Sequence, residues 1–279
     1  MKLEDMQNGK TSQKTFEEYQ ASDGIGREDV IRMLSEFGIA ADACVAVHTS
    51  LRKIGHFQGG AIGLLNALIE QLCDGLLVIP THTWATVRKD SPEFDVRKSE
   101  PCIGIFPQIA SGESLQRKNA TRSLHPTHSA AIFGKGAEAY AAGELQMHSR
   151  TPVNGVWGRL YKQDAKILLI GVGLESNTYL HALDEEINGV PDNLDADFDA
   201  TVIDHDGVHH SVLKMHTTGY WVSRDFPMLE PYLVACGAIR YGNLGFAQVR
   251  CFDVRKGHDA LIDLSKKAED PKCLNSLIR

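Results

Sequence analysis

Short apolar runs alternate with amphipathic segments along most of the chain. Residues 44–48, 76–80 and 166–171 are apolar and are bounded by polar residues or glycines, a pattern typical of strands buried on both faces. Further strands are expected at 129–133 and 246–254. Apolar residues recur with helical spacing in residues 27–37, 59–75, 106–110, 135–145, 174–186 and 257–270. This alternation predicts an α/β protein.

The pattern changes after Pro191, where residues 201–216 form two β-rich arms around Asp206 and Gly207. An Asp-Gly pair between two such arms favours a tight hairpin turn. We therefore expect an antiparallel hairpin inserted into the α/β framework. Residues up to Gly24 are polar and mixed in charge. We expect a polar leader over 1–24, followed by a single domain over 25–279.

Composition narrows the class of protein. The chain has 279 residues, of which 43% are hydrophobic, and a formal net charge of -7. Such a charge disfavours binding to nucleic acid or to anionic membranes. The six cysteines are scattered without a CxxC pair, which fits free thiols in a reducing compartment. No apolar run approaches the ~20 residues of a membrane span. We expect a cytoplasmic protein without nucleic-acid or membrane partners.

The segment 48–55 directly follows the first strand. It combines small hydroxyl residues, a glycine and the adjacent cations Arg52 and Lys53. Ligand crevices form at the carboxyl ends of strands in open α/β sheets, and exposed amides with cations suit a phosphate-bearing ligand. Solvated cations beside an ordinary turn are the alternative interpretation.

A second polar segment, residues 122–129, precedes an expected strand. It holds Arg122, His125 and His128 around Pro126. A guanidinium and two imidazoles can hold an anion or a thioester carbonyl. A rigid loop with incidental histidines is the alternative. Metal binding by the two histidines is disfavoured because no acidic residue or cysteine nearby in the sequence completes a ligand set.

The third segment, residues 177–186, is the start of an expected helix. His181 shares a helix face with Asp184 and Glu185, so a carboxylate can hold one ring nitrogen and leave the other as a base. An amine that attacks a thioester must lose a proton, and an imidazole has a suitable pKa for taking it. An incidental pair on a surface helix is the alternative.

Two other patterns in the sequence do not indicate a binding site. Gly171 and Gly173 follow a strand, but Ser176 stands where a dinucleotide fingerprint has its third glycine. The histidines at positions 205, 209, 210 and 216 straddle the hairpin turn, where alternation points several of them outward. No metal site is therefore expected.

Taken together, the three segments resemble the aminoglycoside 3-N-acetyltransferase family. The resemblance rests on HTSLRKIG, RSLHPTHSAAIFG, KILLIGVG and SNTYLHALDEE, in this order, with further matches in GGAIGLLNAL, LLVIPTHTW and GFAQVRCFD. It spans residues 24–253. It implies a three-layer α/β/α fold with a mixed sheet, distinct from the GNAT superfamily, and acetyl-CoA as the cosubstrate.

The family's functional residues map onto matching positions of this sequence. The resemblance implies that His181 is the general base, with Thr178 beside it. It implies that His82, Asp95 and Asn177 contact the acceptor. The implied coenzyme A site consists of Thr49, Ser50, Leu51, Gly55, Arg122, Ser123, His125 and Pro126. The donors to the developing oxyanion would come from Ser50 or from the loop between Arg122 and His125.

The sequence departs from the family pattern beside the general base. The family has Glu three residues after the histidine, whereas this chain has Asp184 there and Glu185 next. Either carboxylate can therefore be the one that orients His181, and we favour Glu185.

The acceptor is the least determined part of the resemblance. An aminoglycoside is the first expectation, and an amino sugar or a nucleotide-linked amino sugar in a biosynthetic reaction is the second. A protein that binds coenzyme A without catalysis is a third. Acidic residues between Pro191 and Met215 can face a cationic acceptor or solvent. The hairpin can serve as a lid or as the interface of a homodimer.

Overall fold

The computed structural model describes residues 24–147, 149–189, 198–215 and 222–267. The expected leader before Gly24 lies outside these residues. So do Pro191 and the residues that follow it up to 197, together with His216. Within the described residues, every helix is too short or too polar to cross a membrane.

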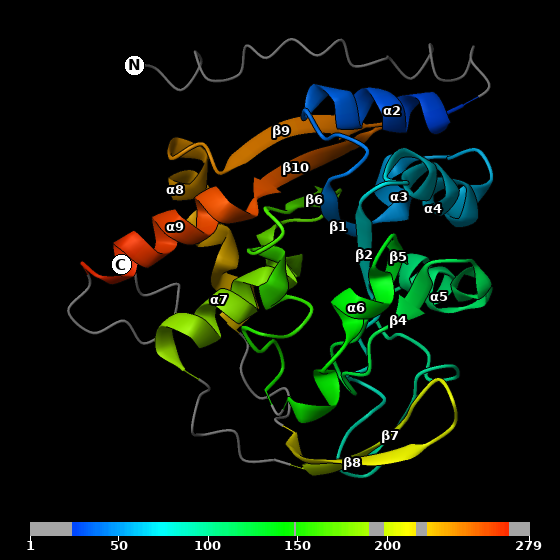
Figure 1. The fold of residues 1–279 in the computed structure, drawn as a ribbon. Helices are drawn as coiled ribbons and strands as arrows, with labels where there is room; N and C mark the ends of the chain where they lie inside the picture. Colours follow the sequence, from blue (N-terminus) through cyan, green and yellow to red (C-terminus); the bar gives the residue numbers. More distant parts are fainter. Residues whose placement is uncertain (1–23, 148, 190–197, 216–221, 268–279) are drawn as a thin grey trace.

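A seven-stranded mixed sheet forms the centre of the molecule, in the order β4-β5-β2-β1-β6-β10-β9 (Figure 1). Its strands are β1 (Cys44–Thr49), β2 (Leu76–Pro80), β4 (Ala120–Arg122), β5 (Ala130–Gly134), β6 (Lys166–Ile170), β9 (Ile239–Leu244) and β10 (Ala247–Asp253). β1 pairs in parallel with both β2 and β6, and the remaining pairs are antiparallel. The carboxyl ends of β2, β1 and β6 therefore meet at one edge of the sheet.

Helices cover both faces of this sheet. They are α2 (Arg27–Glu36), α3 (Leu51–Ile54), α4 (Gly60–Gln71), α5 (Ile105–Ser111), α6 (Ala137–Ala141), α7 (Thr178–Asn188), α8 (Glu230–Ala235) and α9 (Val254–Ser265). Strand β1 shows how its residues divide between the faces, because successive side chains of a strand point to opposite sides. Val45 and Val47 join the core under α2, α4 and α5, whereas Cys44 and Ala46 join the core that includes α7 and α9. The result is three layers.

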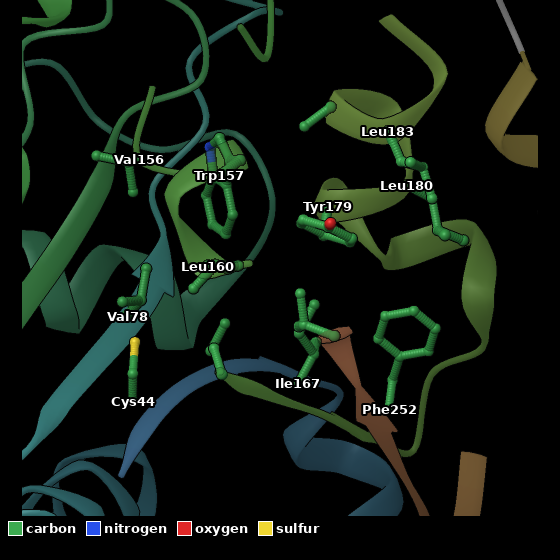
Figure 2. Packing of buried hydrophobic residues seen from close by; sticks show 14 of the residues in the cluster. Cys44, Val78, Val156, Trp157, Leu160, Ile167, Tyr179, Leu180, Leu183 and Phe252 are labelled. Atoms are coloured by element: carbon green, nitrogen blue, oxygen red, sulfur yellow. The ribbon is translucent and has the colours of Figure 1, made fainter. Parts of the chain in front are cut away.

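Helix α7 forms where the sequence supplies both a cap and an apolar face. The side chain of Asn177 accepts a hydrogen bond from the backbone N–H of Tyr179, which satisfies a donor at the helix start. Tyr179, Leu180 and Leu183 are buried against the sheet core around Ile167 (Figure 2). This packing fixes the rotation of the helix and thereby the direction of its polar residues.

A second, three-stranded sheet lies apart from the central one, in the order β3-β7-β8 (Figure 1). It consists of β3 (Glu93–Asp95), parallel to β7 (Phe198–Ile203), and β8 (His209–Met215), antiparallel to β7. The turn at Asp206 and Gly207 is closed by the carboxylate of Asp204, which accepts from the N–H groups of Asp206 and Val208. The sheet has an apolar cluster of its own, which includes Phe94 and Val202.

The α/β class and the mixed sheet with its hairpin insertion are confirmed. The hairpin does not extend the central sheet but builds the small sheet with β3. The expected helix at 135–145 is interrupted: α6 ends at Ala141, and a 3₁₀ turn follows at Glu144–Gln146. Strands β3, β4 and β9 were missed, because two have three residues and β9 reads IRYGNL without a clear apolar run. The terminal helix begins at Val254, three residues before Gly257.

Candidate functional site

A cavity of about 290 Å³ opens at the edge of the sheet where β1, β2 and β6 end. Each strand delivers polar residues to it: His48 and Thr49 from β1, His82 after β2, and Ser176 from the turn that follows β6. Ligand crevices form at such an edge of an open sheet because the connections diverge there. The lining also includes Val47, Pro80, Trp84, Ile103, Phe106, Pro107, His128, Arg150, Val172, Glu175, Thr178, His181 and Ser223.

His181 reaches this cavity from the first turns of α7. It is half-buried, and its ring packs against Phe226 at 4.9 Å between centroids. Thr178, one turn earlier on the helix, lines the cavity beside it. Burial, with a smaller effect from the positive charge of Arg150, lowers the pKa of His181 to about 3. His181 is therefore neutral at physiological pH, the protonation state that a base needs.

Three more histidines face the same cavity around Trp157. The rings of His48 and His82 lie 5.9 and 5.5 Å from the Trp157 ring, and His128 lies 4.8 Å from His82. The Trp157 indole N–H donates to the carbonyl of His128 at 2.8 Å, which fixes the ring in this position. Burial lowers the pKa of all three histidines, to about 3 for His48. All four imidazoles are therefore uncharged.

Several polar atoms at the cavity have no hydrogen-bond partner within the described part of the chain. They are Nε2 of His48, Nε2 of His82 and Oγ1 of Thr49. Nδ2 of Asn177 also has no partner there, although Asn177 is not among the residues that line the cavity. A buried polar atom without a partner costs about 1–3 kcal/mol. Groups of this kind concentrate where a ligand or ordered water completes the hydrogen bonding.

The hydrogen bonds found among the described residues connect both candidate carboxylates to groups other than the His181 ring. Both carboxylate oxygens of Glu185 accept hydrogen bonds from the segment 149–151 instead, and Asp184 accepts from the side-chain amide of Asn188 at 3.0 Å. Glu185, the carboxylate favoured from the sequence, is thus engaged by another segment, because a sequence offset of four residues fixes the helix face but not the competing partner on the facing loop.

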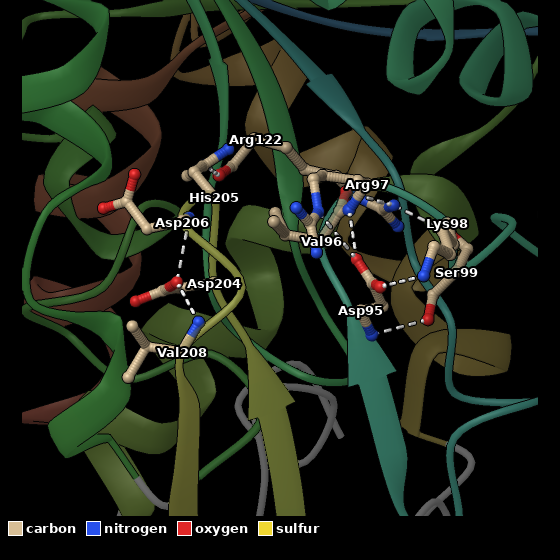
Figure 3. Close-up of polar contacts among 10 residues, drawn as sticks. All are labelled: Asp95, Val96, Arg97, Lys98, Ser99, Arg122, Asp204, His205, Asp206 and Val208. Carbon is tan, nitrogen blue, oxygen red and sulfur yellow. Dashed lines mark hydrogen bonds and ion pairs between the residues drawn. The ribbon is translucent and has the colours of Figure 1, made fainter.

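Most of the loop that joins β4 to β5 lies outside the cavity lining, and His128 is the residue of this loop that lines the cavity. Arg122 is 1% exposed, and its guanidinium donates to Thr81, Ser129, Val96 and Ser99 (Figure 3 shows the contact region). Burial lowers its pKa to about 10, against the opposing effect of Asp95. All three nitrogens of the guanidinium donate to groups of the protein, and Arg122 is not among the residues that line the cavity.

The residues that follow Arg122 in the sequence also form hydrogen bonds within the protein. The Ser123 hydroxyl accepts from the N–H of Ala130. Nδ1 of His125 accepts from the N–H groups of Thr127 and His128, and its Nε2 faces the carbonyl of Ser149 at 2.8 Å. The carbonyl of Pro126 accepts from the hydroxyl of Thr83. This loop thus supports His128 and the segment 149–151 from below the cavity.

The remaining expected site residues divide between the cavity and its surroundings. Thr49 lines the cavity, whereas Ser50 and Leu51 begin the adjoining helix α3. Gly55 ends that helix with φ of +98°, and a Cβ there would lie 2.7 Å from Phe246, so this position requires glycine for structural reasons. Asp95 lies in the small sheet, where it accepts from the backbone N–H of Arg97 at 2.9 Å and pairs with Lys98.

Sequence reasoning did not assign several residues that line the cavity, above all Arg150, Trp84 and Glu175. Arg150 stands alone in the polar stretch HSRTP, with no periodicity or motif to mark it. Its placement depends on a contact between its neighbour Thr151 and Glu185, 34 positions apart in the sequence, which spacing does not reveal.

A sequence profile described as aminoglycoside 3-N-acetyltransferase matches residues 46–265. The chain belongs to the aminoglycoside 3-N-acetyltransferase family. The aminoglycoside N(3)-acetyltransferase IV of Salmonella sp. is 31% identical over 158 residues, 56% of this chain and 57% of that protein. The YokD protein of Bacillus subtilis strain 168, described as aminoglycoside N(3')-acetyltransferase-like, is 23% identical over 58% of this chain and 65% of its own length. These alignments therefore span less than two thirds of both relatives.

Solved structures of this family share the fold over nearly their whole length. The structure of AAC-IIIb binary with CoASH superposes with a TM-score of 0.72 at 18% identity, covering 88% of this chain and 98% of that one. A histidine-to-alanine mutant of AAC(3)-IVa in complex with a gentamicin gives 0.69 at 24% identity, covering 91% and 96%. The α/β/α antibiotic acetyltransferase fold expected from the sequence is thus confirmed.

Proposed function

We propose that this member of the aminoglycoside 3-N-acetyltransferase family transfers an acetyl group from acetyl-CoA directly to an amine of an aminoglycoside, with His181 as general base. The main support for this proposal is that His181 lines the same cavity as Thr49 and His82. Thr49 and His82 come from two separate segments of the sequence that resemble the family. A relative in this fold is bound to CoASH, and another is bound to a gentamicin.

The cavity suits the acyl-bearing end of acetyl-CoA, which supplies an activated acyl group. The pantetheine arm of coenzyme A carries amide groups, and the unpartnered Oγ1 of Thr49 in the cavity lining can bond to such groups. The apolar side chains of Phe106 and Val172 can cover its methylene groups. Thr49 and Thr178 would thus orient the thioester towards His181.

In this proposal His181 takes the proton of the acceptor amine while the amine nitrogen attacks. A neutral imidazole has an open lone pair for this proton, and among the described residues no side chain hydrogen-bonds to the ring. General base catalysis contributes about 100- to 10,000-fold, and holding both reactants in one cavity contributes the larger share.

His181→Ala tests the general base. We expect the variant to bind coenzyme A with unchanged affinity in calorimetry and to lose about 100- to 10,000-fold in kcat in a thiol-release assay. His209→Ala, at an exposed position of the hairpin, is the matched control. A kcat of wild-type size in the His181 variant would remove His181 from the mechanism.

A second acceptor class is favoured by one observation. Among the described residues that line the cavity, the charged side chains are one guanidinium, Arg150, and one carboxylate, Glu175. A polycation is attracted by an excess of carboxylates, so this lining also suits an amino sugar or a nucleotide-linked amino sugar. A panel of both classes in the same assay decides between them. Thiol release from neither, with coenzyme A still bound, would instead indicate a binding protein.

A further inference from the structure

The segment that presents Arg150 is held on both sides by hydrogen bonds. Glu185 accepts from the Ser149 hydroxyl at 2.5 Å through Oε2, and from the N–H and hydroxyl of Thr151, both at 3.0 Å, through Oε1. From the other side, His125 contacts the carbonyl of Ser149. Both sequence neighbours of Arg150 are therefore fixed, and one carboxylate of α7 does most of the fixing.

Arg150 itself lines the cavity together with the histidines. It is only 9% exposed, and its charge lowers the pKa of both His128 and His181. The other titratable or charged groups of the described cavity lining are His48, His82 and Glu175. A guanidinium is charged at any working pH and has five N–H donors, so it can bind a ligand oxygen in addition to a protein partner.

We propose that Arg150 is a catalytic residue that binds the carbonyl oxygen of the thioester as negative charge develops on it, and that Glu185 is the positioning residue of Arg150. This rests on the proposed function. The amine nitrogen forms a bond to the carbonyl carbon, His181 takes the amine proton, and the carbon–sulfur bond breaks. The sulfur leaves with the electron pair and receives that proton, which yields the amide and free coenzyme A.

The structure favours this role for Arg150 over the donors expected from the sequence. The Arg122 guanidinium and His125 are buried below the cavity and occupied. The positive charge of Arg150 makes His181 a weaker base. Arg150 in the cavity lining would therefore slow the reaction unless it also stabilises negative charge that develops elsewhere in the transition state. A preorganised donor to an oxyanion in a site without bulk water offsets that cost, because its removal typically lowers kcat by about 100- to 1,000-fold.

Arg150→Ala is the first test, in the wild-type assay with acetyl-CoA. We expect kcat to fall by about 100- to 1,000-fold with the KM for acetyl-CoA little changed, because the contact forms mainly in the transition state. Guanidinium ion at millimolar concentration should restore part of kcat, whereas sodium chloride at equal ionic strength should not. Arg150→Lys should retain more activity than the alanine variant, and Arg255→Ala, at an exposed position of α9, is the control.

A kcat of Arg150→Ala within about threefold of wild type would overturn the proposal, since an oxyanion donor is worth far more. So would a loss that neither guanidinium nor lysine relieves, because a merely structural residue behaves in that way. These outcomes leave the proposed function standing as long as the wild-type chain turns over acetyl-CoA. A wild-type chain that releases no thiol with any amine would remove both.

A double-mutant cycle tests the positioning role of Glu185. If Glu185 acts through Arg150, Glu185→Ala lowers kcat in the wild-type background but adds little in the Arg150→Ala background. If Glu185 served His181 instead, its effect would persist without Arg150 and disappear in the His181→Ala background, which would contradict the proposal. Glu185→Gln, which keeps acceptors for Thr151, should be milder than the alanine variant. Glu186→Ala, the next position on α7, is the matched control.

Discussion

Two buried polar regions of this chain were both expected to bind ligands, and the structure separates them. Around Arg122, each nitrogen of the guanidinium donates to an acceptor of the protein, including the carbonyls of Val96 and Ser99 (Figure 3). Around the cavity, Nε2 of His48 and Nε2 of His82 meet no partner among the described residues. The first region is complete without a ligand, and the second is not.

The difference reflects what each region does for the fold. Arg122 ties β4 to the loop after β3, so it joins the central sheet to the small sheet. Its ring neighbour Phe94, at 4.9 Å from the guanidinium, belongs to the core of the small sheet. The histidines instead form one wall of an open space. A polar residue in a family motif can therefore be retained for assembly as readily as for binding.

Lowering the pH should give the largest change in the free energy of unfolding, and it acts on the buried histidines of the cavity. The folded pKa of His48 is lowered to about 3, and those of His82 and His128 are also lowered by burial. The unfolded chain therefore binds more protons below a pH of about 6.5, so stability falls as the pH falls from there towards the folded pKa values. Each such histidine contributes up to about 1.4 kcal/mol per pH unit.

Urea unfolding at mildly alkaline, neutral and mildly acidic pH, from about 7.5 down to about 5, measures this dependence. His48→Leu should reduce the slope by about one proton, because it removes one histidine that is neutral only in the folded state. A slope that is unchanged by this substitution would show that His48 is protonated in the folded protein.

Arg122→Met is the next largest change and acts on the other region. We expect the free energy of unfolding to fall by about 3–5 kcal/mol, because the change leaves buried carbonyl and hydroxyl groups without their donor. Chemical denaturation at neutral pH measures it, with Arg88→Met in an exposed ion pair as the control. If Arg122 served mainly as a ligand for coenzyme A, the variant would keep its stability and lose affinity in calorimetry.

The contrast also shows what the sequence can and cannot predict. Apolar runs predicted β1 and β6, because a strand that is buried on both faces is apolar throughout. Helical periodicity predicted α7, because a helix that is buried on one face repeats its apolar residues every three to four positions. The carboxyl edge of the parallel strands followed from that, and with it the placement of Thr49. The family resemblance correctly indicated the fold. It also pointed to His181, which lines the cavity.

Partner choice over long sequence distances was not predictable in the same way. Nothing local distinguishes Arg122, which turns to Ser99, from Arg150, which lines the cavity. Glu185 was expected to hold His181 and instead holds Thr151, 34 positions earlier in the chain. Such pairings depend on how loops pack after the sheet has formed, so spacing on one helix does not determine them.

A smaller effect is expected when a histidine of the cavity wall becomes apolar. His48→Leu removes an imidazole whose Nε2 is unpaired among the described residues, so at neutral pH the free energy of unfolding should stay within about 1 kcal/mol of wild type. This is the opposite of the result expected for Arg122→Met, although both residues are buried. A loss of about 3 kcal/mol or more in thermal or urea unfolding would mean that His48 has an internal partner and that the two regions do not differ.

Asp95→Asn, in the small sheet beside Arg122, should give the smallest change in the free energy of unfolding. Burial tends to raise the pKa of Asp95, but hydrogen bonds from Arg97 and Lys98 outweigh it and lower the pKa below its usual value. The charged form is thus favoured in the folded state, so the carboxylate stabilises the protein at neutral pH and loses this contribution as the pH falls through its folded pKa. Because Arg97 and Lys98 are exposed, we expect the free energy of unfolding to fall by about 1 kcal/mol or less at neutral pH.

The acceptor KM of Asp95→Asn should stay at the wild-type value, since Asp95 does not line the cavity. A rise in that KM of about tenfold without a loss of stability would return Asp95 to the acceptor site that the family resemblance implies.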